Sequence, residues 1–534
     1  MKIPKKKELQ ELQKKYRTDK KIGEVYGVPA RLVAYWRAKK NIGAYSLPKY
    51  SREKVLDLWE RYGDDRLAGR ELGITAAGFR RWRKEYNILK KPAQLKMEQL
   101  ELGILDIIRP GKSSRKETLA RKVLARAANL KTVEVGQDVV ISPDITIAVD
   151  NAGPAIKLFH GNGSSKLWDN SKVIIILNHL PMSDTDHNAD QQKLVRDFVK
   201  KQGIVDFFDI GWGISHQVVF EEGLILPGQL AMSTDNYSAS AGCIGALSLA
   251  ISFEQMAQIW SEGRIRYKVP QTLRATIHGH LARGVSSSDI LFKLSRELAK
   301  FSNKNVAVEF TGQTISSMSM PQRFNLAGLA AEIGIASAIM PYDDVTQRYV
   351  KKVTKAKYKP LKPDFDAEYD YELDVDVSYL TPHVICPNNF KHINPVEEVT
   401  GKKIDHVVLG GCIHSCLDDL EIAAKILRGR RIHRHTRMLV IPSSRKTYLE
   451  ALDKGFIRTF IESGCLVLNP SYSACIDANQ GMLGKGEHAL TTSRIKIDAH
   501  DDIDSSKDIY VASPATAAAS ALNGVITDPR KYLL

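Results

Sequence analysis

The sequence predicts an α/β body of several domains, preceded by a small, basic, all-helical region. Three observations support this prediction: a strong charge asymmetry, an internal repeat in the first hundred residues, and apolar β-rich runs alternating with helical segments further on. The 534 residues carry 77 Lys and Arg against 61 Asp and Glu, a net charge of +16, and 43% of them are hydrophobic. Such a chain is too apolar to be disordered and long enough for several packed domains.

The excess positive charge is confined to the first fifth of the chain. Residues 1–100 hold 26 Lys and Arg and 12 Asp and Glu, which leaves 51 basic and 49 acidic residues for the remainder. We therefore expect a small anion-binding module attached to a near-neutral body. The apolar runs are far shorter than the ~18 residues of a membrane span, so we expect no membrane partner and no secretory signal. Six cysteines are too few for a disulfide framework, which favours a cytoplasmic location.

The basic region contains a duplicated unit with an offset of 46 residues, in which Trp36 aligns with Trp82. Each copy has the pattern of two helices, a glycine turn and a third helix that begins at Pro29 or Thr75. This order resembles homeodomain-like helix-turn-helix modules. The two units are expected at residues 1–45 and 50–92, within a region of residues 1–95.

The third helix of each unit is expected to bury an apolar stripe, namely Leu32, Val33 and Trp36 in the first unit and Phe79 and Trp82 in the second. The opposite face is basic. A basic helix of this kind can enter the major groove of DNA while flanking cations neutralise phosphates. We expect DNA binding, with protein docking and a role in solubility as alternatives. The expected DNA-binding side chains are Arg31, Arg37, Lys39 and Lys40, together with Arg80, Arg81, Arg83 and Lys84.

The body begins near residue 97 and is predicted to contain parallel sheets. Five apolar runs are typical of buried strands, with helical segments between them. These runs cover residues 173–177, 274–278, 306–310, 406–409 and 437–441. The polar stretch 343–392 has little periodicity, so we expect a linker or a peripheral excursion there.

Polar residues suited to chemistry follow the predicted strands. Asn178 and His179 come directly after the run 173–177, where side chains face the ligand crevice of an open sheet. His216 and Asp235 precede a loop rich in Gly, Ser and Ala that begins at Ala239, whose backbone N–H groups suit a carboxylate. Each histidine is equally compatible with a hydrogen-bonded interior residue.

A third segment, Gly410 to Cys416, places cysteines after a glycine pair at a strand end. Cys412 and Cys416 in this segment, and Cys475 further along, are plausible metal or cluster ligands. A lone cysteine is also compatible with a small core hydrophobe.

The order and spacing of these motifs across residues 97–534 resemble the large subunit of 3-isopropylmalate dehydratase and homoaconitase, in the aconitase superfamily. The resemblance is carried by motifs that include Asn178-His-Leu-Pro, Gly213-Ile-Ser-His-Gln, Thr234-Asp235, Ala331-Glu332-Ile-Gly, Gly410-Gly-Cys412, Ile441-Pro-Ser-Ser444, Cys475 and Ala512-Ser-Pro-Ala.

This resemblance implies a three-domain α/β core and a hydro-lyase that acts on a small hydroxy di- or tricarboxylate. It implies a 4Fe-4S iron–sulfur cluster that acts as a Lewis acid, and a separate small subunit that carries the swivelling domain. The implied domains are residues 97–270, 271–385 and 386–534. The implied site residues are His179, His216, Asp235 and Glu332 for catalysis, Ser493, Arg494 and Asn236 for substrate, and Cys412, Cys475 and Cys416 for metal.

The chain departs from the family pattern at several of these positions. Asn178 replaces an Asp, Tyr237 replaces a His, and Tyr472 stands where the family has a cluster cysteine. A phenolate imitates a thiolate only partly, so we expect a modified iron–sulfur site. The candidates for a replacement ligand are Cys416 or His414, Cys465 and Cys243.

Two functions follow from this pattern. The first is a hydro-lyase with a modified iron–sulfur site fused to a DNA-binding module. The alternative is a catalytically impaired regulator that binds DNA through its N-terminal units and senses a metabolite or iron status.

Overall fold

The structure is a computed structural model, and the chain in it divides into two compact units, Met1–Ser114 and Arg115–Leu534. The structure describes residues 4–16, 18–43, 50–62, 65–72, 74, 76–86, 88, 116–150, 152–178, 185–302, 304–387, 392–411, 413–471, 483–492 and 508–533. Within these ranges no helix is long and apolar enough to cross a membrane.

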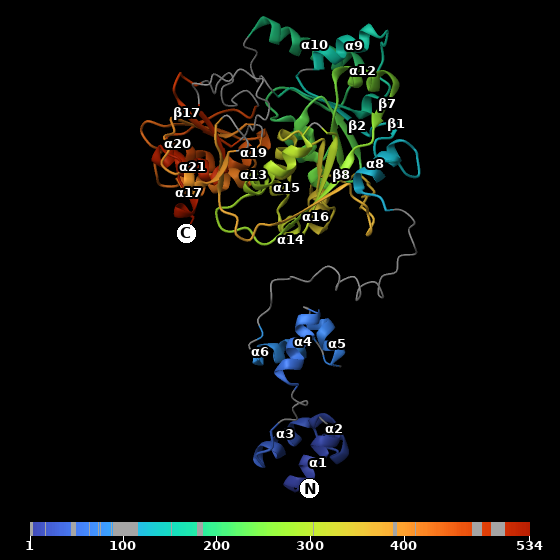
Figure 1. The fold of residues 1–534 in the computed structure, drawn as a ribbon, viewed down its shortest axis with the longest axis vertical. Coiled ribbons are helices and arrows are strands. Elements are labelled where there is room, and N and C mark those ends of the chain that lie inside the picture. Colours follow the sequence, from blue (N-terminus) through green and yellow to red (C-terminus); the bar gives the residue numbers. More distant parts are fainter. Residues whose placement is uncertain are drawn as a thin grey trace. The chain divides into compact units, whose positions relative to one another are not determined.

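The N-terminal unit holds two successive three-helix repeats, drawn in blue in Figure 1. The first contains α1 (Lys6–Tyr16), α2 (Asp19–Tyr26) and α3 (Ala30–Lys39), and the second contains α4 (Arg52–Tyr62), α5 (Asp65–Glu71) and α6 (Ala76–Glu85). Helix α2 ends at Gly27, whose φ of 64° is left-handed and suits a residue without Cβ. Pro29 directly precedes α3, as the sequence predicts.

Each repeat buries its own small apolar core. Leu9, Ile22, Val33 and Trp36 pack together in the first repeat, and an equivalent set that includes Phe79 packs in the second. One sequence prediction is wrong: Leu32 is not part of the buried stripe but is 36% exposed. Neighbouring helical residues differ by about 100° in direction, so burial of Val33 turns Leu32 towards solvent.

The same ion pair occurs in both repeats and corrects two predicted DNA contacts. Arg37 Nε donates to Asp19 Oδ1 at 2.7 Å, and Arg83 Nε donates to Asp65 Oδ1 at 2.8 Å. Both arginines are buried, and each also donates to a backbone carbonyl, that of Ile42 or that of Ile88. Arg37 and Arg83 are therefore internal clasps between the second and third helices and are not presented to a ligand.

The body contains three main sheets, which confirms the predicted α/β class. The first has the order β4-β3-β2-β5-β6 and is entirely parallel. Its strands are β2 (Ile145–Ala148), β3 (Val173–Ile176), β4 (Phe207–Phe208), β5 (Leu230–Ser233) and β6 (Leu247–Ala250).

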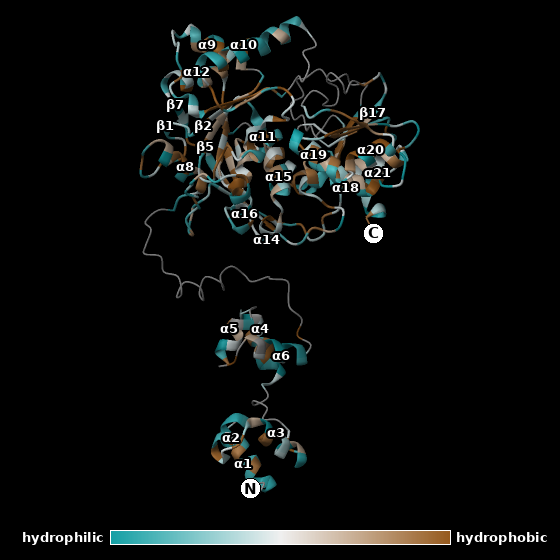
Figure 2. Cartoon of the chain, turned by 180° about the vertical axis from the view of Figure 1, so that it is seen from behind, coloured by the Kyte–Doolittle hydropathy of each residue, from teal (hydrophilic) through white to brown (hydrophobic). Residues whose placement is uncertain are grey.

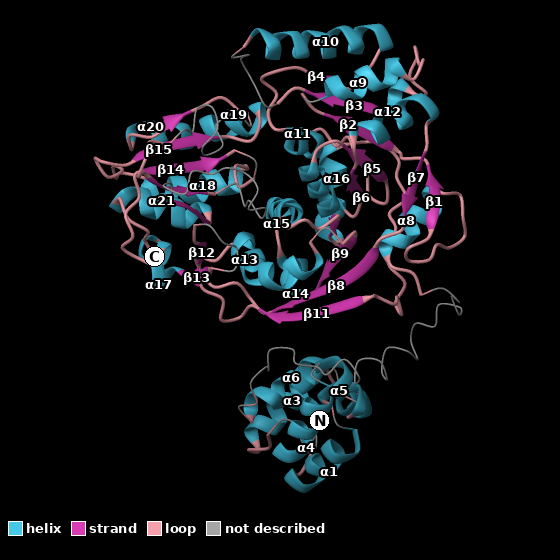
Figure 3. Ribbon diagram, turned by 45° about the horizontal axis from the view of Figure 1, so that its top comes forward, coloured by secondary structure: helices cyan, strands magenta, loops and turns pink. Residues whose placement is uncertain are grey.

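Helices cover both faces of the first sheet. Along β3, Ile174 and Ile176 enter one core while Val173 and Ile175 enter the other. In Figure 3, α9, α10 and α12 lie on one side of the sheet and α11 on the other, in agreement with these cores. The covering elements are α8 (Leu119–Ala127), α9 (Ala152–Gly161), α10 (Asp186–Gln202), α11 (Ser215–Glu221), the 3₁₀ segment η2 (Asn236–Ile244) and α12 (Phe253–Glu262).

The second sheet has the order β10-β9-β8-β11 and is also parallel. Its strands are β8 (Gln271–His278), β9 (Val306–Thr311), β10 (Ser337–Ile339) and β11 (Tyr371–Asp376). Its helices are α13 (Ser287–Leu298), α14 (Gln313–Ser317), α15 (Met320–Glu332) and α16 (Asp344–Val353).

The polar stretch 343–392 is not a bare linker. It supplies α16, the edge strand β11 and the strand β12 (His383–Ile385). Residues of β11 alternate between half-buried and exposed, and those facing solvent are acidic. An edge strand of this kind has no continuous apolar run, which explains why hydrophobicity alone gave no signal.

The third sheet has the order β13-β12-β18-β17-β14-β15-β16 and is mostly parallel, with β12 antiparallel to both of its neighbours. Figure 2 shows hydrophobic residues in brown on the strands of the body. The other strands of this sheet are β13 (Ile393–Pro395), β14 (His406–Gly410), β15 (Arg437–Ile441), β16 (Leu466–Val467), β17 (His488–Thr491) and β18 (Asp508–Ala512). Its helices are α17 (Val396–Val399), α18 (Leu417–Leu427), α19 (Arg445–Asp453), α20 (Phe456–Glu462) and α21 (Pro514–Asn523).

All five predicted strand runs are strands in the structure, as β3, β8, β9, β14 and β15. The small antiparallel pair β1 (Asp138–Ile141) and β7 (Ile265–Lys268) flanks the first sheet in sequence. The domain boundaries expected after residues 270 and 385 stay predictions.

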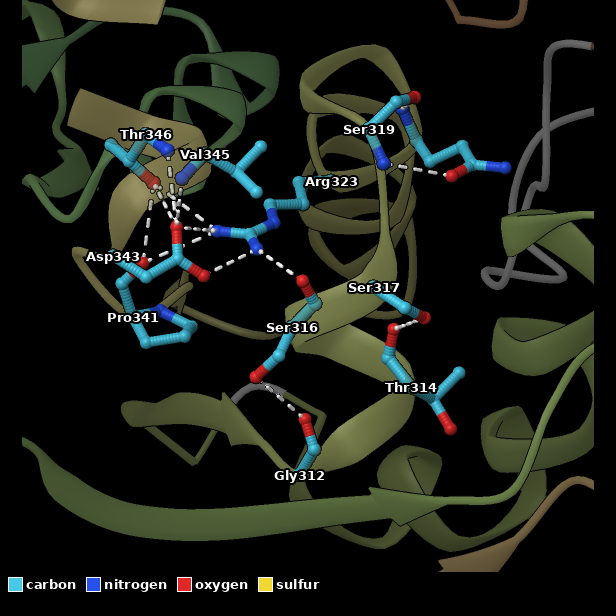
Figure 4. Close-up of polar contacts among 11 residues, drawn as sticks. Gly312, Thr314, Ser316, Ser317, Ser319, Arg323, Pro341, Asp343, Val345 and Thr346 are labelled. Carbon is cyan, nitrogen blue, oxygen red and sulfur yellow. Dashed lines mark hydrogen bonds and ion pairs between the residues drawn. The ribbon is translucent and has the colours of Figure 1, made fainter. Parts of the chain in front are cut away.

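Arg323 of α15 is fully buried and holds three helices of the second sheet together (Figure 4). Its Nη2 pairs with Asp343 Oδ2 at 2.6 Å, and Nη1 donates to Asp343 Oδ1 at 3.0 Å. The same guanidinium donates to the backbone carbonyl of Ser316 on α14 and to the hydroxyl of Thr346 on α16. Because these donors are used inside the protein, Arg323 acts as a structural anchor.

The clasp between Asp65 and Arg83 gives a testable prediction about stability. Arg83→Ala leaves the Asp65 carboxylate buried without its main partner, so the free energy of unfolding of the second repeat should fall by about 3 kcal/mol. Hydrogen exchange of α5 and α6 in the full chain measures this loss. The exposed Arg81→Ala is the matched control and should change exchange little; equal effects of the two variants would contradict the assignment.

Acid should weaken the same clasp. Burial opposes ionisation of Asp65, but hydrogen bonds from Arg83 and Arg80 hold the pKa of Asp65 below its usual value. The stabilisation is therefore complete above about pH 4 and is lost as the pH falls through the lowered pKa.

Candidate active site

Three neighbouring strands of the first sheet end beside polar residues. Asp150, Asn178 and Asp235 each lie two positions beyond the last residue of β2, β3 and β5. Since these strands are parallel and adjacent, the three side chains are placed along one edge of the sheet. The Asn178 backbone N–H donates to Asp150 Oδ2 at 2.6 Å.

Asp150 is a residue that the sequence prediction missed. The signal was available, because Asp150 closely follows the short apolar run of β2, as Asn178 follows β3. Asn178 is only 4% exposed, and within the described ranges neither polar atom of its side chain has a hydrogen-bond partner. A buried side-chain amide without hydrogen-bond partners is suited to a ligand that both donates and accepts hydrogen bonds.

Asp235 is oriented by two contacts that join β5 to α11. Ser215 Oγ, on the first residue of α11, donates to Asp235 Oδ2 at 2.8 Å. The backbone N–H of Tyr237 donates to Asp235 Oδ1 at 3.0 Å, so the carboxylate also caps η2. The position of Asp235 is thus fixed by local turn geometry directly after the strand.

His216, Tyr237 and Glu332 meet next to this carboxylate. The His216 ring is 5% exposed and stacks on Tyr237, with ring centroids 5.3 Å apart, and on Phe324, with centroids 5.6 Å apart. The Tyr237 phenol donates a hydrogen bond to Glu332 Oε1. Since Glu332 ends α15, the cluster joins the first sheet to the second.

The structure brings together some of the sequence-predicted site residues and leaves others outside its description. His216, Asp235 and Glu332 lie in or beside this cluster, and Asn236 is exposed next to Asp235. The remaining predicted residues, His179, Ser493 and Arg494, lie outside the described residues. Tyr237 appeared in the sequence only as a departure from the family pattern, yet it contacts both His216 and Glu332.

A cavity of about 10 Å³ lies behind the cluster and is lined by residues that include Ser215, His216 and Asp235. This volume suits about one water molecule, so the cavity is not a pocket for a polycarboxylate.

Glu221 docks the first sheet against the third. Its carboxylate accepts hydrogen bonds from Ser444 Oγ at 2.6 Å and Thr447 Oγ1 at 2.9 Å, both from the start of α19, and from Gln217 on its own helix. Burial raises the pKa of Glu221, although these hydrogen bonds oppose the rise.

Gly213 is required at the same junction, because a Cβ there would lie 2.5 Å from the Ser443 carbonyl oxygen. A cavity of about 280 Å³, lined by Trp212, Glu221 and other residues, adjoins this junction.

Three of the described cysteines, Cys243, Cys416 and Cys465, are buried thiols. Cys416 Sγ donates to Asp419 Oδ2 at 2.8 Å and caps α18, and burial raises the pKa of Cys416 well above its usual value. Cys465 lies in the core of the third sheet, where burial raises its pKa to about 12. Cys243 lies in the core between the first and second sheets, where burial also raises its pKa.

These thiols do not fit a cluster held by three cysteines. Cys412, Cys475 and Tyr472 lie outside the described residues, so a third thiolate would have to come from Cys243, Cys386, Cys416 or Cys465. Burial raises the pKa of all four, and no three His, Cys, Asp or Glu within the described part of the chain are grouped to hold a metal. His414 is buried beside Asp419, with 3.6 Å between Nδ1 and Oδ1.

The body combines parallel α/β sheets with a group of polar residues at the strand ends of the first sheet. The aconitase family (aconitate hydratase) matches residues 165–402 and 390–524. The 3-isopropylmalate dehydratase large subunit 1 of Methanopyrus kandleri is 35% identical over 418 residues, which are 78% of this chain and 100% of that protein. This chain therefore belongs to the aconitase family.

Two further proteins are similar to the chain. The probable methanogen homoaconitase large subunit of Methanosarcina mazei is 37% identical, over 71% of this chain and 95% of its own. The crystal structure of aconitase X from Thermococcus kodakaraensis, in the holo-form, matches with a TM-score of 0.42 and 14% identity, over 75% of this chain and 92% of that one.

The donor set gives a prediction about iron. We expect anaerobic reconstitution of the purified chain to yield less iron and sulfide than a full 4Fe-4S cluster requires, because the third thiolate is missing. Tyr472→Cys supplies a thiol at the position where the family has one and should raise both contents. Ser471→Cys is the matched control and should not. A full cluster in the unaltered chain would contradict the prediction.

Proposed function

We propose that the body is a hydro-lyase, similar to the large subunit of 3-isopropylmalate dehydratase, that acts on a small hydroxy di- or tricarboxylate. The observation that carries this proposal is the hydrogen bond from Tyr237 to Glu332 beside the buried His216. A phenol, a carboxylate and an imidazole are thereby grouped at the position where the family handles protons, even though the family's histidine is absent.

Dehydration requires a proton for the departing hydroxyl and a base for the carbon-bound proton. Tyr237 is suited to the first role when Glu332 carries a proton. The phenol then gives its proton to the departing hydroxyl, and the Glu332 carboxylic acid returns a proton to the phenolate across the same contact. His216 stacks on the same phenol and restricts its position. The base would come from a separate small subunit, in keeping with relatives that are named large subunits.

In this proposal, polar residues at the strand ends of the first sheet recognise the substrate. The amide of Asn178 offers one donor pair and one acceptor at the edge of the sheet. The sequence resemblance adds Asn236, Ser493, Arg494 and His179 to the proposed substrate-binding residues. A neutral amide at position 178 favours a substrate hydroxyl or carboxylate over a cation.

The cofactor in this proposal is a modified iron–sulfur site. Cys412 and Cys475 stand at family ligand positions. Cys416, the third ligand expected from the sequence, is bonded to Asp419 through its thiol, so the proposed site relies on two cysteines. When bound, such a group supplies a Lewis acid for the substrate oxygens.

We further propose that the N-terminal unit binds duplex DNA. With Arg37 and Arg83 assigned to internal clasps, the remaining cations of α3 and α6 are exposed or half-exposed. They are Arg31, Lys39, Lys40, Arg80, Arg81 and Lys84. Arg80 also contacts Asp65 at 2.9 Å, yet its side chain is 59% exposed.

Removing the phenol or the carboxylate tests the hydro-lyase. Tyr237→Phe and Glu332→Gln should each lower kcat by about 100-fold or more, with little change in KM, because they affect proton transfer and not binding. Turnover of a panel of hydroxy di- and tricarboxylates, with a small subunit from one of the relatives, measures the effect. Tyr358→Phe, which removes a phenol bonded to Tyr342 elsewhere, is the control.

If the unaltered chain binds a hydroxy acid but never turns it over, the alternative of a metabolite-sensing regulator replaces the hydro-lyase.

DNA binding is tested by its dependence on salt. Binding of the full chain to random duplex DNA should weaken by at least about tenfold between 50 and 200 mM salt, because phosphate contacts release counterions. Arg81→Ala should reduce both affinity and salt slope. Binding that does not change with salt, or no binding at all, would refute a phosphate-contacting interface.

A further inference from the structure

The two N-terminal repeats keep the same interior but differ at the exposed positions of their third helices. At an offset of 46 residues, Val33 corresponds to Phe79 and Trp36 to Trp82, and the Asp19–Arg37 clasp corresponds to the Asp65–Arg83 clasp. The clasps fix α3 and α6 in equivalent orientations within their own repeats. Equivalent positions on the two helices therefore face outward in the same way.

The outward face of α3 combines cations with apolar and aromatic groups. Arg31, Tyr35 and Lys39 are spaced four residues apart, so they form one stripe along the helix. All three are exposed, and Tyr35 and Leu32 are 56% and 36% exposed. Ala34 and Ala38 occupy the neighbouring stripe.

The outward face of α6 has a different set at the same positions. Arg80 and Lys84 stand where α3 has Ala34 and Ala38, and Arg81 stands where α3 has Tyr35. The other two positions also change, because Ala77 replaces Arg31 and Glu85 replaces Lys39. The positive stripe of α6 is thus rotated around the helix relative to that of α3.

Resting on the DNA-binding function proposed above, we infer that the two repeats recognise two different half-sites and not one repeated sequence. Arginine is suited to paired contacts with guanine O6 and N7, and apolar side chains contact the thymine methyl group. Arg80 and Arg81 on α6 select a guanine-rich half-site. Arg31 with Leu32 and Tyr35 on α3 selects a half-site that combines guanine with thymine. The preferred DNA is then a bipartite duplex without repeat symmetry.

Selection of duplex DNA from a randomised pool by the full chain tests this inference. The unaltered chain should enrich two distinct sequence elements in the same duplex. The double variant R31A/K39A should lose the element with thymine and keep the guanine-rich one, and R81A/K84A should do the reverse. Each loss should correspond to at least about tenfold weaker binding to the affected element.

A matched control removes the same charge from a different helix. Lys7 and Lys14 are exposed on α1, so K7A/K14A should weaken binding uniformly and keep both elements. Two outcomes would overturn the inference but leave the DNA-binding function intact. One is enrichment of the same sequence element twice. The other is loss of the same element in both the α3 variant and the α6 variant. Absence of salt-dependent binding would overturn the proposed DNA-binding function and this inference together.

Discussion

The hydrogen bond from the Tyr237 phenol to the Glu332 carboxylate joins the first sheet to the second, and the candidate site is arranged around it. Tyr237 is placed by η2, which begins directly after β5, and Glu332 by the end of α15. The buried Arg323 anchors α15 to its neighbours, so the carboxylate is held by the packing of the whole second sheet. Asp235 and Ser215 then fix α11, which presents His216 to the same phenol.

In this arrangement Tyr237 connects the elements that cover the first and second sheets. A phenol at position 237 reaches Glu332 across the junction of the two sheets and stacks on His216. The carboxylate therefore keeps a hydrogen-bond donor from the first sheet. The cysteine positions show no comparable compensation within the described residues, because Cys243, Cys416 and Cys465 are buried and Cys416 is bonded to Asp419.

The sequence predicted those features that depend on continuous local patterns. Apolar runs located β3, β8, β9, β14 and β15, and the repeat located both three-helix units. Strand β11 was missed because an acidic edge strand has no apolar run. The predicted DNA-binding roles of Arg37 and Arg83 were wrong. The position of an arginine in the sequence of an amphipathic helix is the same whether its side chain pairs with a buried Asp or faces solvent. The contact of Tyr237 with Glu332 joins distant segments, which a single sequence does not reveal, whereas Asp150 was missed although its place after the β2 run was visible.

Exchange of the hydroxyl oxygen of a hydroxy acid with solvent tests the central claim most directly, because departure of this hydroxyl is the step that takes a proton from Tyr237. The full chain, a small subunit from a relative and a candidate hydroxy dicarboxylate are incubated in water that carries a heavy oxygen isotope and followed by mass spectrometry. We predict incorporation of the isotope with the unaltered chain and its loss in both Tyr237→Phe and Glu332→Gln. Incorporation that is equal in all three proteins would contradict a catalytic role for the Tyr237–Glu332 pair.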